Sequence, residues 1–295
     1  MPRYEYKYRL PQRRRLRLYW LIPIVLIAVM IVYPFFEATQ LDVKTHEFRV
    51  SDLPANLRNL RIAFASDIHQ CAWFSQERVN EVINEINMLD ADIVVLGGDY
   101  AMDSDGAIRF FQTMPQLQAR LGVFAVMGNH DRTLPEKNLS VLITQMKDAG
   151  VTPLVNEVSR VKVGQTYVYL AGVDDKNTGH PDVDKVASQV QSGDFVIFAG
   201  HTPDLLPDML KAKSADGKSH WYDLALFGHT HGGQVNLFGY TPFFNLSPEV
   251  GSRYLTGWLE ENRAAILVSN GVGTSGAPMR LFARPQIHLV TLKAR

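Results

Sequence analysis

The stretch YDLALFGHTHGGQ, residues 222–234, joins a short apolar run to two histidines that are flanked by glycines. The length and continuous apolarity of YDLALF predict a buried β-strand. On an extended chain, residues i and i+2 face the same side, so His229 and His231 are expected to share a target. The glycines allow close approach of the backbone or a positive φ. Taken alone, the stretch fits a polar turn without a ligand equally well.

The same pattern recurs from residue 60 onward, because short apolar runs repeatedly end in polar residues and glycine. These runs are LRIAFASD, ADIVVLGGD, GVFAVMGNHD, YVYLAGVDD, DFVIFAG, YDLALFGHT, AAILVSNG and IHLVTL. Helical patterns follow the first three, at residues 75–89, 105–117 and 136–150. Strands that alternate with helices predict an α/β layered domain. Residues 239–259 break the alternation and are predicted to form a long aromatic loop.

The composition is that of a folded globular protein, with 46% hydrophobic and 20% charged residues in a chain of 295. Residues 1–17 carry seven Lys or Arg and one acid, which leaves 23 basic and 29 acidic residues in the remainder. An acidic body disfavours nucleic acid as a partner. Because Cys71 is the only cysteine, the chain has no internal disulfide framework and no thiolate metal cluster.

Residues 18–36, LYWLIPIVLIAVMIVYPFF, contain no charged residue. About 20 such residues span a bilayer as a helix. The following FFEATQL lacks a small-x-small cleavage site, which favours a retained anchor over a signal peptide. The sequence thus predicts a basic cytoplasmic N-terminus (1–17), a transmembrane anchor (18–36), a connector (37–58) and one folded domain (59–295). The positive charges before the span place the N-terminus in the cytoplasm and the domain outside the inner (cytoplasmic) membrane.

Polar residues that bind metals gather where the predicted strands end. In open α/β sheets, sites form beyond the carboxyl ends of the strands. Oxygen, amide and imidazole ligands without thiolates suit manganese, iron or zinc. Seven such ligands are too many for one open site and about right for two divalent ions that share a carboxylate. The candidate ligands are Asp67, His69, Asp99, Asn129, His201, His229 and His231.

The series SDIH, GGD, GNHD, GH and GHTHGGQ, in this order, resembles the calcineurin-like metallophosphoesterase superfamily. The segments LAGVDD and FGHTHGGQVNLFGY further resemble its membrane-associated bacterial branch, which includes phosphodiesterases and UDP-2,3-diacylglucosamine hydrolases. The resemblance covers residues from about 40 to 295. It implies a four-layer αββα sandwich of two mixed sheets.

The resemblance also implies a role for each candidate. Asp67, His69 and His231 would bind a first metal, and Asn129, His201 and His229 a second, with Asp99 as the bridge. A metal-bridging hydroxide would attack phosphorus. His130 would act as the catalytic acid beside the scissile phosphate. Relatives orient this histidine with an acid, and Asp103 and Asp131 are both candidates here.

The sequence therefore predicts a membrane-anchored phosphoesterase for a phosphodiester, a pyrophosphate or a phosphomonoester. A lipid-linked substrate fits the anchor. Its apolar rim would be formed by Cys71, Trp73 and Phe74 with Phe243, Phe244 and Leu246, or these residues simply pack a loop. One alternative is the UDP-2,3-diacylglucosamine pyrophosphatase of lipid A synthesis, although its nucleotide substrate lies on the cytoplasmic side. Another is a catalytically silent metal-binding scaffold or sensor. The GDxxDRG motif of protein phosphatases is absent.

Overall fold

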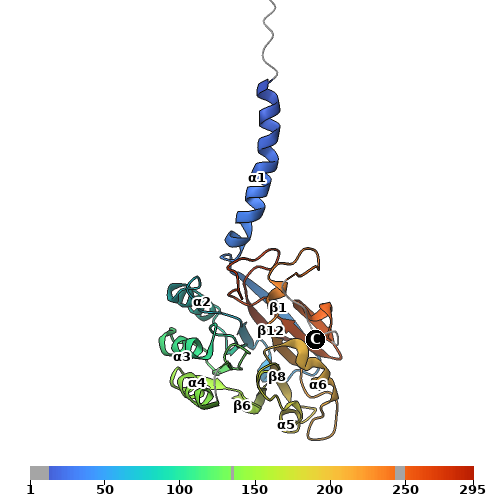
Figure 1. Cartoon of the computed structure of the whole chain (residues 1–295). Helices are drawn as coiled ribbons and strands as arrows, with labels where there is room; N and C mark the ends of the chain where they lie inside the picture. Colours follow the sequence, from blue (N-terminus) through green and yellow to red (C-terminus); the bar gives the residue numbers. More distant parts are fainter. Residues whose placement is uncertain (1–12, 134–135, 243–249) are drawn as a thin grey trace, which may run out of the picture.

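The computed structural model describes residues 13–133, 136–242 and 250–295, with only the backbone for 13–20 and 136–137. Twelve strands form two six-stranded sheets (Figure 1). The first sheet has the order β1 (Asp42–Val50), β12 (Gln286–Ala294), β2 (Arg61–Ala65), β3 (Ile93–Leu96), β4 (Val123–Ala125) and β5 (Val151–Pro153). The second has the order β10 (Gly257–Glu261), β11 (Ala264–Val268), β9 (Leu224–Phe227), β8 (Phe195–Ala199), β7 (Thr166–Gly172) and β6 (Glu157–Val163).

Three hydrophobic clusters separate four layers, which makes the domain an α/β fold with two mixed sheets, as predicted. One cluster lies between the first sheet and its helices, one between the sheets, and one behind the second sheet. The helices are α2 (Gln76–Met88), α3 (Ser104–Thr113) and α4 (Glu136–Asp148) on one side, and α5 (Val183–Ala187) and α6 (Leu206–Lys211) on the other. Short 3-10 turns occupy Ala55–Leu57, Pro203–Leu205, His231–Gly233 and Ser252–Tyr254.

The three predicted helices are present, and their apolar faces enter the core. In α2 the face consists of Val79, Val82, Ile83 and Ile86. Helix α3 ends at Thr113, two residues before Pro115, because the residue before a proline disfavours the helical conformation. The predicted aromatic loop at 239–259 is shorter than expected, since its end forms β10 against β11. Its residues 243–249, with Phe243, Phe244 and Leu246, lie outside the described residues.

Helix α1 (Arg13–Glu37) projects away from the domain (Figure 1). Its apolar side chains from Leu21 onward are largely exposed, among them Met30 at 70%. At its foot, Arg280 N–H donates to Pro34 O over 2.9 Å, and Ala283 N–H donates to Glu37 Oε1 over 3.1 Å. Where side chains are described, from residue 21 onward, no helix combines the length and apolarity that a membrane crossing needs. Residues 1–12 of the expected basic N-terminus lie outside the described residues.

The strand directions place the foot of α1 and the strand ends that bear the polar motifs at one edge of the first sheet. Strand β1, which lies within the segment expected as a connector, runs parallel to β12, and β12 runs antiparallel to β2. Strands β3, β4 and β5 are parallel to β2. The start of β1, just after α1, therefore lies beside the carboxyl ends of β2, β3 and β4.

The core between the sheets is expected to dominate the stability of the domain. Ile197 in β8 is fully buried there, so Ile197→Ala leaves a cavity and should lower the free energy of unfolding by about 2–5 kcal/mol. The measurement is urea denaturation of the full chain in detergent. Leu210→Ala is the control, because Leu210 is 57% exposed and its loss should change that energy by less than about 0.5 kcal/mol. Equal effects of the two substitutions would contradict this layering.

Candidate metal centre

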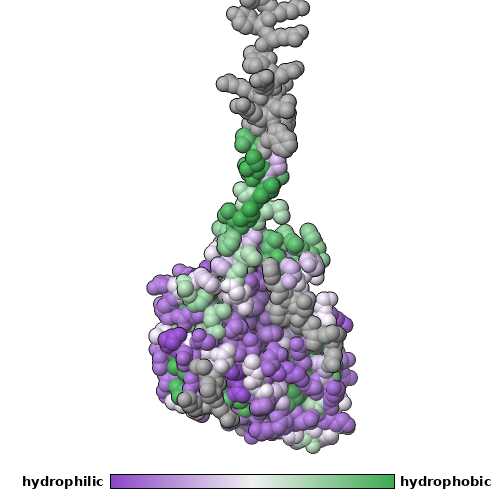
Figure 2. All heavy atoms as spheres, viewed as in Figure 1, coloured by the Kyte–Doolittle hydropathy of each residue, from purple (hydrophilic) through white to green (hydrophobic). Residues whose placement is uncertain are grey.

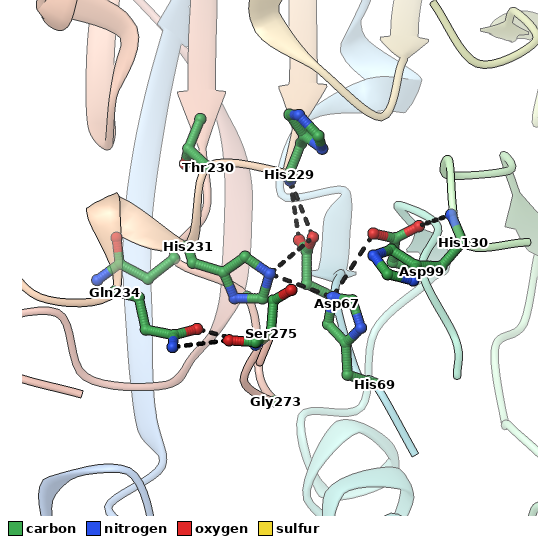
Figure 3. Close-up of polar contacts among 12 residues, drawn as sticks. Asp67, His69, Asp99, His130, His229, Thr230, His231, Gln234, Gly273 and Ser275 are labelled. Carbon is green, nitrogen blue, oxygen red and sulfur yellow. Dashed lines mark hydrogen bonds and ion pairs between the residues drawn. The ribbon is translucent and has the colours of Figure 1, made fainter. Parts of the chain in front are cut away.

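The predicted residues follow the carboxyl ends of five strands. Figure 3 shows six of them close together: Asp67, His69, Asp99, His130, His229 and His231. Asp67 and His69 follow β2, Asp99 follows β3, and Asn129 and His130 follow β4. His201 follows β8, and His229 and His231 follow β9, so the second sheet supplies its own share of the site. All but Asn129 belong to three groups whose candidate ligand atoms lie within 4.8 Å of one another. Two of these groups draw on both sheets, and the third joins His130 to His69 and Asp99.

Asp67, His69 and His231 form the first of these groups, and all three are buried. The Nε2 atoms of His69 and His231 are 3.1 Å apart. His231 Nε2 lies 3.7 Å from Asp67 Oδ1. The three candidate ligand atoms therefore lie close enough together to bind one ion.

Asp99, His201 and His229 form the second group. His229 Nδ1 lies 3.1 Å from His201 Nε2, which in turn is 3.2 Å from Asp99 Oδ2. The same Asp99 oxygen is 3.5 Å from His69 Nε2 in the first group. Asp99 thus lies close to histidine nitrogens of both groups.

Asn129 contributes an unsatisfied atom to this site. Its Oδ1 is buried and has no hydrogen-bond partner among the described residues, and the residue lines the same cavity as His229 and Asp99. A buried amide oxygen without a partner is unfavourable unless a cation or a donor occupies the space in front of it. The cavity holds about 140 Å³. These residues therefore suit hard or borderline divalent cations.

The turns that carry these side chains have an unusual backbone. Asp67, His69, Asp99, His229 and His231 all have φ between 50° and 68°, a left-handed conformation that non-glycine residues rarely adopt. Such strain gathers at functional sites, where the surrounding structure enforces it. Two neighbouring glycines are required because a side chain at either position would overlap residues of the site. A Cβ at Gly128 would overlap Asp99 and His201, and one at Gly228 would overlap Asp67.

Burial sets the protonation of the histidines in the metal-free chain. It lowers the pKa of His69 and of His229 to about 4, and it holds the pKa of His231 well below the ordinary value. Neutral imidazoles have a lone pair free for a metal. His201 is the exception, because Asp99 outweighs the effect of burial and raises the pKa of His201 well above its usual value. Metal binding would then release a proton from this residue.

His130 lies beside the first group, with its ring 4.9 Å from that of His69. Its backbone N–H donates to Asp99 Oδ1 over 2.8 Å, and its Nδ1 lies 2.9 Å from the carbonyl oxygen of Met102. A carbonyl accepts only, so Nδ1 carries the proton and Nε2 is the atom available to a substrate. The partner that orients the ring is thus a backbone carbonyl rather than Asp103 or Asp131.

Both acids have other tasks. Asp103 caps α3 by accepting the N–H of Gly106 over 2.7 Å. Asp131 is buried and accepts the N–H groups of Asp99 and Gly128 on Oδ2, both over 2.8 Å, and that of Tyr100 on Oδ1. It therefore holds the loop after β3 against the loop after β4.

Arg280 is a residue of this site that the sequence did not single out. It is fully buried, and its Nη2 lies 3.2 Å from His231 Nδ1. Its guanidinium also donates to the carbonyl oxygens of Gly273, Ala283 and Asn270. The surrounding SGAPMRLFARP offered two arginines, Arg280 and Arg284, among small and apolar residues, and nothing in it distinguishes the buried arginine from the other.

Asp131→Asn should weaken the hydrogen bonds that hold the backbone of Asp99 in place. Whichever way the amide points, its NH2 group faces at least one buried N–H, so the free energy of unfolding should fall by about 1–3 kcal/mol. Metal content by mass spectrometry should fall as well, because Asp99 loses its support. Asp103→Asn is the control, since asparagine caps helices as well as aspartate does. A loss of metal in that control, or none in Asp131→Asn, would contradict this role.

Comparisons with known proteins agree with this geometry. The sequence pattern of the calcineurin-like phosphoesterase family matches residues 60–233. An uncharacterized metallophosphoesterase of Aquifex aeolicus is 30% identical over 281 residues, which cover 91% of this chain and 98% of the relative. The uncharacterized metallophosphoesterase YkuE of Bacillus subtilis is 28% identical and covers 88% of each chain.

A third relative, from Danio rerio, is named a transmembrane protein with metallophosphoesterase domain. It is 29% identical, over 92% of this chain and 62% of its own length. The family match spans more than half of the chain and includes the ends of all five strands that carry the motifs. The chain therefore belongs to the calcineurin-like phosphoesterases and is a metal-dependent hydrolase of phosphoesters.

Proposed function

We propose that this protein is a membrane-anchored phosphoesterase whose site holds two divalent ions, with manganese, iron and zinc as the candidates. The observation that carries the proposal is the position of Asp99, which lies within 3.5 Å of a histidine nitrogen in each of two ligand groups. The matching family is one of phosphoesterases, which favours an enzyme over a metal-binding scaffold without activity.

The donor atoms suit one ion in each group. Asp67, His69 and His231 would hold the first ion, and His201, His229 and Asn129 the second, with Asp99 shared. The fit is supported by the imidazole nitrogens that face each other at 3.1 Å in both groups and by the unpartnered Asn129 Oδ1.

Two such ions, when bound, acidify an attacking water and stabilise the attacking and leaving oxygens of an in-line displacement at phosphorus. The protein's own part begins with His130, whose Nδ1–H is held by the Met102 carbonyl. This bond leaves Nε2 for the substrate. With a second proton on Nε2, the imidazolium would donate that proton to the leaving oxygen and return to the neutral ring. The backbone bond from His130 to Asp99 fixes the distance between this acid and the ligands.

The cavity restricts which part of a substrate reacts inside it. At about 140 Å³ it is smaller than the pockets of about 300–1,000 Å³ that enclose whole small molecules. A phosphoryl group would enter, while the rest of a phosphodiester, pyrophosphate or phosphomonoester would lie on the rim near Gln234 and Ser275. A larger hollow of about 770 Å³ lies at the opposite ends of the strands, near Phe195 and Ala264, far from this chemistry.

Membrane attachment by α1 is part of the proposal, with the N-terminus in the cytoplasm and the domain outside. The charge-free segment 18–36, the exposed apolar side chains of α1 and the transmembrane relative support it. The foot of α1 lies at the same sheet edge as the metal ligands, which favours a lipid-linked phosphoester. This orientation speaks against UDP-2,3-diacylglucosamine, whose nucleotide lies in the cytoplasm.

His231→Ala should remove a ligand from the first ion. We expect about one metal ion fewer per chain. The value of kcat/KM should fall about 100-fold or more, because the lost ion no longer stabilises the transition state, and each 1.36 kcal/mol of lost stabilisation is tenfold in rate. The assay is a chromogenic phosphodiester with the full chain in detergent, and metal is counted by mass spectrometry. His220→Ala, at the far hollow, is the control and should change neither value. Full activity of His231→Ala would contradict the assignment of His231 as a metal ligand.

His130→Gln separates proton transfer from metal binding. The substitution should lower kcat by about 10²–10⁴-fold, as expected for loss of a general acid. The metal count should remain that of the wild type, because His130 is not among the proposed ligands. The same experiment measures the ratio of diester to monoester turnover, which shows which class of phosphoester the enzyme prefers. A metal count that falls together with kcat would instead make His130 a ligand.

A further inference from the structure

The segment just after the GHTHGGQ motif forms a hairpin that holds a phenylalanine out in solvent. Leu237 and Tyr240 exchange both backbone hydrogen bonds, over 2.9 and 3.1 Å, so Phe238 and Gly239 make a two-residue turn. Their φ values are 54° and 96°. Turns with two positive φ values favour asparagine followed by glycine. A phenylalanine at the first position is a poor turn former, and its side chain is 97% exposed.

A second phenylalanine repeats these features on a neighbouring loop. Phe282 has φ 55°, is 61% exposed, and its ring centre lies 5.8 Å from that of Phe238. Tyr240 is 68% exposed beside them. Bulky residues in the left-handed region are genuine outliers, and strain of this kind persists where function requires it. Neither turn chemistry nor core packing accounts for these aromatic side chains.

Backbone bonds join this aromatic pair to the foot of α1. Asn236 N–H donates to Leu281 O and Leu281 N–H donates to Gln234 O, both over 2.9 Å. On either side of Phe282, Arg280 and Ala283 bond Pro34 and Glu37 at the end of α1. The two loops and the helix end are thus one connected unit. The exposed Phe35 and Phe36 of α1 extend the same apolar surface.

The surroundings suit a lipid surface. Figure 2 shows hydrophobic side chains gathered at the foot of α1, whereas the rest of this face of the domain is largely hydrophilic. Residues 235–241 and 279–284 contain no acidic residue. Aromatic side chains are enriched at the level of the lipid headgroups, where apolar rings meet water. An exposed patch of this kind marks an interaction site.

We propose that Phe238, Tyr240 and Phe282 form a membrane-contact surface, which enters the headgroup region of the bilayer that holds α1. The inference rests on the anchor in the proposed function and adds a second point of attachment. Two attachments would fix the tilt of the domain, which one helix alone does not. Gln234 belongs to both the cavity lining and the bonded unit, so the metal centre would then face the lipid.

The test measures immersion depth by site-directed spin labelling of the full chain in vesicles of phosphatidylethanolamine and phosphatidylglycerol. Cys71→Ser removes the only cysteine, and Phe238→Cys or Phe282→Cys introduces the label site. Leu210→Cys and Met88→Cys are matched controls, because both are exposed apolar residues, on α6 and α2. We expect labels at 238 and 282 to collide more with oxygen than with a water-soluble nickel complex, and both controls to show the reverse.

The outcomes separate this surface from the anchor. Vesicle flotation of the same samples reports the anchor itself, and a chain that fails to float would overturn both. A floating chain whose labels at 238 and 282 behave like the controls would overturn the contact surface alone. Spin–spin broadening at 238 that grows with the protein-to-lipid ratio would mean that a second copy covers the patch, and would also overturn it.

Discussion

The carboxylate of Asp67 accepts the backbone N–H of His229 over 3.0 Å, and this contact joins the two sheets at the edge where the site lies. A second bond between the sheets runs from His201 Nδ1 to Gly97 O, and His201 is itself held to the end of β9 by the bond from Gly228 N–H to His201 O. Because ligands from both sheets must meet within a few ångströms, the strand ends have to be fixed against each other. This requirement accounts for the left-handed turns and for Gly128 and Gly228, where a side chain would not fit.

The buried guanidinium of Arg280 lies next to the candidate metal site. Arg280 is fully enclosed, and backbone carbonyls accept most of its hydrogen bonds. An isolated buried charge is strongly unfavourable unless hydrogen bonds compensate it. Here the same guanidinium touches the ring of His231, and the backbone of Arg280 bonds the end of α1. Arg280 therefore connects the candidate ligand His231, the loop that carries Phe282 and the end of α1.

The edge that carries the chemistry is also the edge that carries α1. This coincidence follows from strand direction alone, since β1 and β2 run in opposite directions on either side of β12. A phosphoester at the surface of a bilayer would reach such a site without leaving the membrane. The small cavity and the aromatic surface beside it fit a reacting headgroup whose remainder stays in lipid.

The sequence by itself determined the α/β class and the position of every candidate ligand, because periodicity and strand-end motifs are local properties of the chain. Only the tertiary structure decided that Met102 rather than an acid orients His130, that Asp131 supports two loops, and that Arg280 lies under His231. It also decided that Phe238 meets Phe282. These contacts join residues between about 30 and 50 positions apart, and no local pattern specifies which distant backbone group will fill a given space.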